Sequence, residues 1–261
     1  MSGRWLPGVP GKDLEAIFDE AAGNEIARGK FDNPKSSAAL AGNAFGFFLH
    51  RASDLPVLPE CQREIWPACS LLIEAELRFP WSGGRHPHLD CLVETPSALI
   101  GIESKRFEPF GPRTSADLSR AYWRKNDGGG SIWGEHMSGY ERIRDILKEN
   151  PKRFTHLDAA QLFKHAFALR TEVHRRRQCD SLNPILFYLY AEPDNWPDGK
   201  PVAKDKKNQH RKEIAAFGKI VFDDEVRFIP CSWQRLLKDW ENAPNADISE
   251  HAKRVLSKYG C

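Results

Sequence analysis

The sequence predicts an α/β protein built from layers of helix and sheet. Short runs in which apolar and polar residues alternate, the pattern of strands, gather in the first half of the chain. Segments with apolar residues at helical spacing stand before and after them, so helices and strands share one layered unit. Hydrophobic residues make up 41% of the 261 and charged residues 28%, a composition that favours a packed core over disorder.

Two helices are expected first. Residues 12–29 carry apolar side chains at helical spacing. Ser36 or Ser37 is placed to cap a second helix from Ala38 to about Arg51. This second helix is apolar on most sides, so we expect it to be buried.

Strands are expected next. Residues 70–79 read as one strand, and residues 88–95 and 98–107 read as a hairpin. Alternation in both runs and the tight Pro96–Ser97 connection support the hairpin.

The remaining chain mixes helices and strands. Helices are expected at 114–126 and 136–149, separated by the breaker Asp127–Gly130, and then at 156–177 with Thr155 as its cap. The other expected elements are a strand at 185–190, a loop at 192–206, a helix at 207–220, a strand at 225–230, and helices at 232–242 and 246–258. Nothing in this order requires a linker, so a single domain over 1–261 is predicted.

Composition narrows the function classes. The chain has no run of about 18 apolar residues, and its start lacks the apolar stretch of a signal peptide, so a cytoplasmic protein without membrane contact is expected. Its six cysteines form no C-x-x-C pair, which favours reduced thiols over zinc. A net charge of +2 neither requires nor excludes nucleic acid. Basic runs at 174–177 and 204–212 are most simply read as solvated surfaces.

The hairpin carries a cluster of acids and a base. The period of two places Asp90 on one face with His88, and places Glu103 on one face with Lys105 and Gly101. Antiparallel pairing then brings Asp90 near Glu103 and Lys105. Two carboxylates in a partly buried cleft repel each other unless a cation joins them, and Mg²⁺ prefers such oxygen ligands. Gly101 would leave room for a ligand. The alternative is a salt-bridged, exposed hairpin face.

Asp90, twelve intervening residues and then Glu103-Ser104-Lys105 resemble the signature of the PD-(D/E)XK nuclease superfamily. The resemblance covers about 36–190 and implies a restriction-endonuclease-like core, a mixed β-sheet flanked by helices. The chain departs from the pattern in two ways. His88 and Leu89, rather than proline, precede the aspartate, and Pro87 lies three residues before it. The helix near 36–51 has no carboxylate, and Asn43 is its best polar candidate.

By this resemblance, Asp90 and Glu103 would hold Mg²⁺ (or Mn²⁺ in vitro), with the Ser104 carbonyl as a further ligand. Lys105 would orient or activate the attacking water. The chemistry agrees, because phosphodiester hydrolysis needs a metal to activate water and a cation beside the developing charge.

The helix at 156–177 supplies three more candidates. Gln161, Lys164 and His165 fall on one face beside its apolar stripe. Some groups that resemble RecB nucleases carry a glutamine here with a tyrosine four residues later, where this chain has His165. Gln161 is thus a candidate at the active-site edge, and Lys164 is a candidate phosphate contact. Polar residues at a helix boundary are the alternative.

Other residues are weighed beside these. Arg124, in an aromatic and basic run, is a candidate contact to bases or backbone, although such aromatics are more often core. His88 is expected to support Asp90, and a zinc site with His86 is disfavoured beside Lys105. Glu74 or Glu76 could supply a missing acid, with salt-bridged strand residues as the alternative.

The sequence therefore predicts a metal-dependent nuclease, most simply acting on DNA. The first alternative is a nuclease-like fold that binds nucleic acid or protein without cutting. The second is a hydrolase of small phosphorylated substrates, disfavoured because no glycine-rich phosphate loop is present. The sequence leaves a homodimer open.

Overall fold

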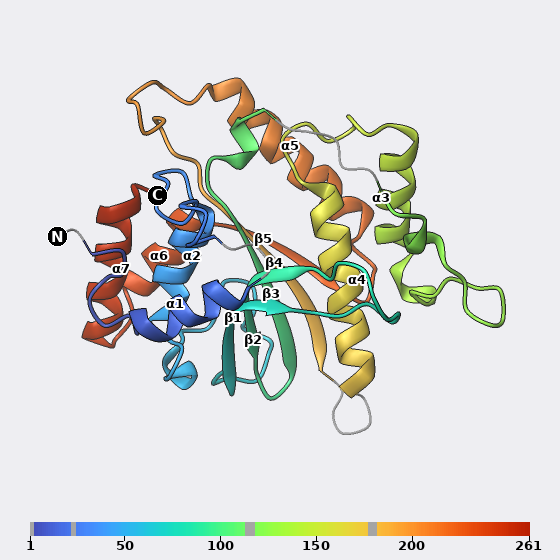
Figure 1. Cartoon of the computed structure of the whole chain (residues 1–261), viewed down its shortest axis with the longest axis horizontal. Coiled ribbons are helices and arrows are strands. Elements are labelled where there is room, and N and C mark those ends of the chain that lie inside the picture. The colour runs from blue at the N-terminus through green and yellow to red at the C-terminus, as the bar shows by residue number, and fades with distance from the viewer. Residues whose placement is uncertain (1–2, 22–24, 113–117, 177–181) are drawn as a thin grey trace.

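The computed structural model describes residues 3–21, 25–112, 118–176 and 182–261. Its centre is a five-stranded sheet in the order β1-β2-β3-β4-β5 (Figure 1). The strands are β1 (Ser70–Glu76), β2 (His88–Glu94), β3 (Ala98–Lys105), β4 (Asn183–Tyr190) and β5 (Arg227–Ser232). Pairing is antiparallel from β1 to β3 and parallel from β3 to β5, so the predicted mixed sheet is confirmed.

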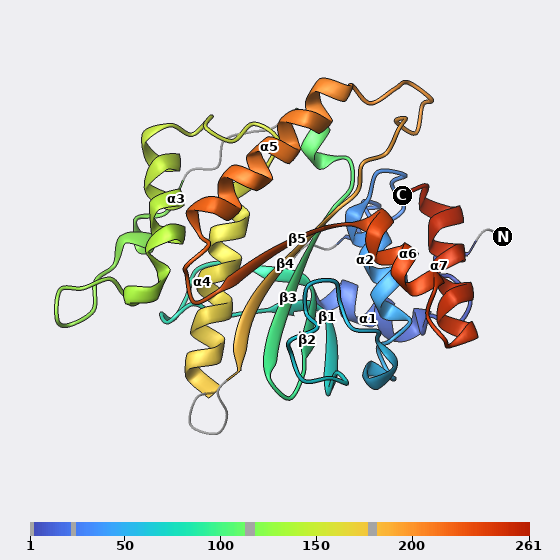
Figure 2. The ribbon, with the colours of Figure 1, turned by 180° about the vertical axis from the view of Figure 1, so that it is seen from behind.

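Helices cover both faces of the sheet, as Figure 2 shows from behind. One layer consists of α1 (Gly11–Glu20), α2 (Ser37–Gly46), α6 (Trp233–Glu241) and α7 (Ala246–Tyr259). The other consists of α3 (Ser138–Glu149), α4 (Ala159–Arg176) and α5 (Lys204–Ile220). Parallel neighbours need a crossover connection, which α4 provides between β3 and β4 and α5 between β4 and β5. Among the described residues, no helix is both long and apolar enough to cross a membrane.

Two hydrophobic cores lie on the two sides of the sheet. Because β3 and β4 are covered on both faces, they read as nearly continuous apolar runs. Gly101 sits at the closest approach of α4, where an added Cβ would lie 2.6 Å from Leu89 and 2.9 Å from Leu169. The expectation that Gly101 leaves room for a ligand is therefore wrong, because side chains of the core fill that space.

Most predicted elements are confirmed, with shifts at their ends. The hairpin, the strand at 185–190 and the C-terminal helices are present. The first helix is shorter than expected, since it ends at Glu20 and residues 25–29 form a turn, while 22–24 lie outside the described residues. α2, capped by Ser36, ends at Gly46 rather than near Arg51. The described cysteines are free thiols, and Cys179 lies outside that part of the chain.

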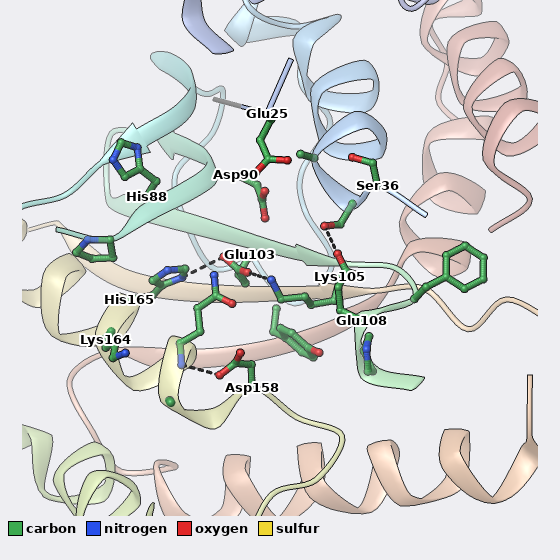
Figure 3. A pocket seen from close by; sticks show the side chains of 18 of the residues that line it. Glu25, Ser36, His88, Asp90, Glu103, Lys105, Glu108, Asp158, Lys164 and His165 are labelled. Carbon is green, nitrogen blue, oxygen red and sulfur yellow. Dashed lines mark hydrogen bonds and ion pairs between the residues drawn. The ribbon is translucent and has the colours of Figure 1, made fainter. Parts of the chain in front are cut away.

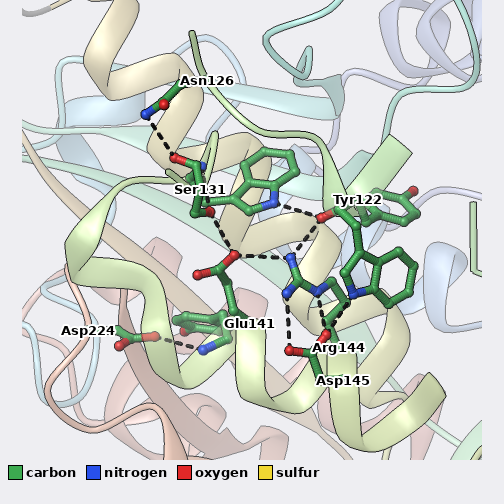
Figure 4. A network of polar contacts seen from close by, with 10 residues as sticks. Tyr122, Asn126, Ser131, Glu141, Arg144, Asp145 and Asp224 are labelled. Carbon is green, nitrogen blue, oxygen red and sulfur yellow. Dashed lines mark hydrogen bonds and ion pairs between the residues drawn. The ribbon is translucent and has the colours of Figure 1, made fainter. Parts of the chain in front are cut away.

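The helix expected at 114–126 is wrong for its described part, since residues 118–126 contain only a 3₁₀ turn at Arg120–Trp123. Residues 113–117 lie outside the description. A polar cluster that we call the α3 network explains the difference (Figure 4). The Tyr122 carbonyl accepts hydrogen bonds from the Trp133 indole at 3.0 Å and the Arg144 guanidinium at 2.8 Å, in place of a helical N–H. The network consists of Tyr122, Trp123, Ser131, Trp133, Glu141, Arg144 and Asp145.

The cap of α4 also differs from the prediction. The backbone N–H groups of Thr155, His156 and Leu157 all donate to the carboxylate of Glu213 on α5. Three residues before the helix are thus held by α5, and Asp158 takes over as the cap by accepting from the Gln161 N–H at 3.0 Å. The helix therefore begins at Ala159, and its expected last residue, Arg177, lies outside the described residues.

Candidate active site

A groove of about 1060 Å³ lies at one end of the sheet, between the start of α2 and the first turns of α4 (Figure 3). Residues from β1, β2 and β3 line it, together with segments on either side. We call Glu74, Asp90, Glu103, Lys105 and His165 the carboxylate floor of this groove. Four of these side chains come from β1, β2 and β3, which are otherwise largely apolar, and His165 comes from α4.

Asp90 is fixed against β3 by its own carboxylate. The last paired residues of β2 and β3 are Cys91 and Ile102. Beyond them, the Ser104 N–H donates to Oδ2 of Asp90 at 2.6 Å, so a side chain replaces a backbone carbonyl as the acceptor. This bond ties Asp90 to the residue between Glu103 and Lys105.

Glu103 is held by a cation at one oxygen and a histidine at the other. The Lys105 ammonium donates to Oε1, and Nδ1 of His165 lies 3.2 Å from Oε2. Glu103 and His165 are both buried. Burial alone would raise the pKa of Glu103, but Lys105 and His165 outweigh it and lower that pKa. Burial would likewise lower the pKa of Lys105, but Glu103, Glu108 and Asp90 raise it.

The other two acids of the floor are harder to ionise. Burial raises the pKa of Asp90 well above its ordinary value, and the charge of Glu103 adds to the effect. Burial, with repulsion from Glu103 and Glu25, raises the pKa of Glu74 to about 7. Three carboxylates thus share one lysine and one histidine, so acidic groups outnumber basic groups in the floor.

Glu74 reaches the groove through an unusual backbone. Its φ of 52° lies in the left-handed region, which costs a residue with a Cβ about 1 kcal/mol or more. Ile73 packs in one core and Ala75 in the other, although a period of two would place them on one face. Cys91 and Leu89 divide in the same way. Both strands therefore turn over at Glu74 and Asp90, and Leu89 does not share a face with Cys91, although strict alternation would place the two together.

The structure brings the predicted α4 residues to the groove. Gln161, Lys164 and His165 all line it. Nζ of Lys164 lies 5.6 Å from the centre of the Tyr122 ring, and burial lowers the pKa of this lysine. His88 lines the groove as well, with Nδ1 3.3 Å from the Glu74 carbonyl and Nε2 3.5 Å from Glu76.

Two candidates lie away from the groove. Asn43 is fully buried, where its amide donates to the Tyr259 hydroxyl and the Ala39 carbonyl and accepts from the Leu6 N–H. It joins α2 to α7 and has no group left for a ligand. The Arg124 guanidinium lies over the Trp81 ring at 4.9 Å and does not line the groove.

Sequence reasoning missed several groove residues. Glu25 lies in the turn after α1, where a continuous helix was expected, so nothing marked it. Glu108 accepts from the Ser37 hydroxyl and the Arg106 N–H, which places α2 beside the end of β3. Its position three residues after Lys105 could have identified it. Of the two acids considered on β1, Glu74 lines the groove, whereas Glu76 pairs with Arg78 outside it.

The carboxylate floor has the ligand types that a divalent cation prefers. Carboxylate oxygens are the ligands that Mg²⁺ prefers, and a cation would relieve the repulsion that raises the pKa of Asp90 and Glu74. In the described part of the chain, no three histidine, cysteine, aspartate or glutamate side chains are already grouped to enclose an ion. The lysine and histidine on Glu103 occupy its oxygens instead.

Comparison with known families decides the affiliation of the chain. Residues 4–260 match the model of REase-ARP, described as Restriction Endonuclease associating with ARP. The chain belongs to the REase-ARP family. No curated protein and no solved structure matches it significantly. The family indicates an endonuclease-type enzyme and a nucleic-acid substrate, and the mixed sheet flanked by helices is consistent with a restriction-endonuclease-like fold.

Proposed function

We propose that this REase-ARP protein is a Mg²⁺-dependent endonuclease of the PD-(D/E)XK type that hydrolyses phosphodiester bonds in DNA. The observation that carries the proposal is the carboxylate floor. Asp90, Glu103 and Lys105 meet in one groove, and the acids there outnumber the cations. A buried excess of negative charge is unfavourable in a structural core but suits a metal centre.

Asp90 and Glu103 would hold the ion, with the Ser104 carbonyl and Glu74 as further oxygen donors. When bound, Mg²⁺ (or Mn²⁺ in vitro) supplies polarisation of the phosphate and a lowered pKa for water. Glu74 would take the place of the acid that the α2 sequence lacks.

Lys105 contributes positive charge rather than a base. The neighbouring carboxylates of Glu103, Glu108 and Asp90 raise its pKa and favour the protonated ammonium. It can orient that water and offset charge that develops on the phosphate. His165 keeps Glu103 in place, and Gln161 borders the site.

Cations around the groove would contact the DNA backbone. Lys164, Lys35 and Arg85 line the groove beyond the carboxylate floor. Their ammonium and guanidinium groups match phosphate oxygens, and His88 lines the groove as well. A monomer would nick one strand, whereas a homodimer would place two such grooves for a double-strand cut.

Cleavage assays test the proposal. Supercoiled plasmid, linear duplex and single-stranded DNA are incubated with Mg²⁺, Mn²⁺ or EDTA. We expect cutting by wild type with either metal, none with EDTA, and none by Asp90→Ala or Glu103→Ala. Glu94→Gln is the matched control, because Glu94 lies on β2 like Asp90 but pairs with Arg176 away from the groove. Cleavage by both alanine variants would contradict the proposed mechanism.

A binding protein without cleavage is the second candidate, favoured by the absence of a preformed ion cage among the described residues. Tight DNA binding without metal, and no cleavage with any divalent ion, would select it over the nuclease.

A further inference from the structure

A second pocket of about 610 Å³ adjoins the groove. Asn33 and Phe107 line both cavities, so the two are neighbours. The pocket lies where the end of β3 meets the C-terminal end of α7 and the segment before α2. Nothing in the proposed mechanism uses it.

Two cations in this pocket form no ion pair with any described acid. The Arg106 guanidinium, 8% exposed, donates to the carbonyls of Pro34 and Tyr259, and its Nε is buried without a hydrogen bond. The Lys258 ammonium donates to the carbonyls of Arg4 and Gly3, at 2.6 and 3.3 Å. No carboxylate in the described part of the chain forms an ion pair with either side chain.

The acids of the pocket are already neutralised. Asp32 pairs with Arg4 at 2.8 Å, and Asp194 pairs with Lys207 at 3.0 Å. Burial lowers the pKa of Arg106 against the opposing effects of Cys261, Tyr259 and Glu108, and burial lowers that of Lys258 against the attraction of Asp32. Asp32 and Glu108 thus attract the two cations without forming ion pairs with them, which leaves Lys258 able to take an anionic ligand.

A tryptophan separates the two cavities. Trp196 lines the groove, while its neighbours from Pro193 to Pro197 line the second pocket. Its ring stacks on Phe107 with centroids 5.2 Å apart, and the Lys35 ammonium lies 4.7 Å from the ring centre. Backbone hydrogen bonds within the loop, such as Trp196 N–H to Lys200 O at 2.7 Å, hold it in place.

We propose that the second pocket binds a backbone phosphate of the nucleic-acid strand after that strand leaves the groove past Trp196. This inference rests on the proposed function, and it describes where the bound strand runs beyond the groove. Guanidinium and ammonium groups are the usual phosphate ligands, and an aromatic ring at the boundary suits an adjacent base. The pocket thus contributes affinity at a distance from the scissile bond.

Lys258→Gln tests this, because the side chain is exposed and its loss should leave the fold intact. Binding of a labelled oligonucleotide is measured by anisotropy against salt, in an Asp90→Asn background that prevents cutting. We expect about 3- to 10-fold weaker binding and a slope of log K against log salt smaller by about 1. Lys258→Arg should retain both values. Lys253→Gln, an exposed lysine of α7 that does not line the pocket, is the matched control.

The outcomes separate the two proposals. Equal affinity and slope for Lys258→Gln and Lys253→Gln would overturn the second site and leave the nuclease standing. Binding that depends on Lys258, together with no cleavage by the wild-type protein with any divalent ion, would support the site and reject the nuclease. A further experiment measures the rise in melting temperature that inorganic phosphate alone produces. If Lys258→Gln abolishes this rise without changing DNA binding, the pocket binds a free anion, and the proposal that it binds a phosphate of the strand is overturned.

Discussion

The carboxylate floor and the α3 network are both partly buried polar clusters, but they balance charge differently. In the network, Arg144 donates to Glu141, Asp145 and the Tyr122 carbonyl. Burial would raise the pKa of Asp145, yet hydrogen bonds from Arg144 and Trp123 lower it. In the floor, Glu103 alone is paired with a cation, Lys105, and the pKa of Asp90 and of Glu74 is raised. Arg144 binds both acids of the network, whereas two acids of the floor have no such partner among the described residues, which is the arrangement expected of the proposed metal site.

Asp90→Asn should give the largest separation of activity from stability. Loss of a proposed metal ligand should reduce cleavage by about 10³-fold or more. Removing one of three repelling acids should leave the melting temperature unchanged or higher. Single-turnover cleavage and thermal unfolding measure the two effects. If Asp90→Asn cuts normally, or melts well below wild type, then the carboxylate floor does not differ from the α3 network in serving activity rather than stability.

Arg144→Met should show the opposite behaviour. It leaves Glu141, Asp145 and the Tyr122 carbonyl without their donor, and we expect a loss of about 2–3 kcal/mol in unfolding free energy. Cleavage by the folded fraction should stay within a few-fold of wild type. Arg142→Met, an exposed neighbour on α3, is the control in the same denaturant titration. Equal stability of the two variants would mean that the network does not support the fold.

The floor should also make stability depend on pH. Glu74 has an ordinary pKa of 4.5 and a folded pKa of about 7, so between these values the folded protein binds more protons than the unfolded chain. Stability should therefore fall as pH rises from about 4.5 to 7, by roughly 2 kcal/mol.

Glu74→Gln should flatten this dependence, and saturating Mg²⁺ should flatten it in wild type. Glu76→Gln, on the same strand but outside the groove, should keep the wild-type slope. Urea titrations across this pH range provide the measurement, and parallel curves for all three proteins would contradict the assignment.

Trp123→Phe should have the smallest effect. It removes one donor to Asp145, at 2.7 Å, from a carboxylate that solvent reaches. We expect a loss below about 1 kcal/mol, present at neutral pH and fading in acid, because the folded pKa of Asp145 is depressed. A loss of the same size at low pH and at neutral pH would show that indole packing, not the hydrogen bond, is responsible.

The hairpin and its acids could be predicted because their geometry is local. A short turn and the antiparallel register suffice to bring Asp90 beside Glu103 and Lys105, although the alternation itself breaks at Asp90. Helical spacing likewise suffices to put Gln161, Lys164 and His165 on one face of α4. These residues reach the groove because α4 crosses back over the strand ends.

What could not be predicted depends on distant contacts or on one dihedral angle. The left-handed φ of Glu74 turns two strands over, and no pattern in a glutamate between apolar residues indicates it. Asn43 looked like a polar candidate in an apolar helix, but its partners are Leu6 and Tyr259. Thr155 was predicted to cap α4, but its N–H donates to Glu213, 58 positions later in the chain.

The bond between Asn43 and Tyr259 joins residues 216 positions apart. Through it, α7 seats α2, whose first residues form one wall of the groove. Contacts that close so long a loop lose much chain entropy before they stabilise anything, so they form late in folding. The sheet and α4 can assemble earlier from nearer contacts. Because α2 also packs against β1, β2 and β3, it can reach its place beside the groove early, and the bond to α7 would fix it there only in the last stage of folding.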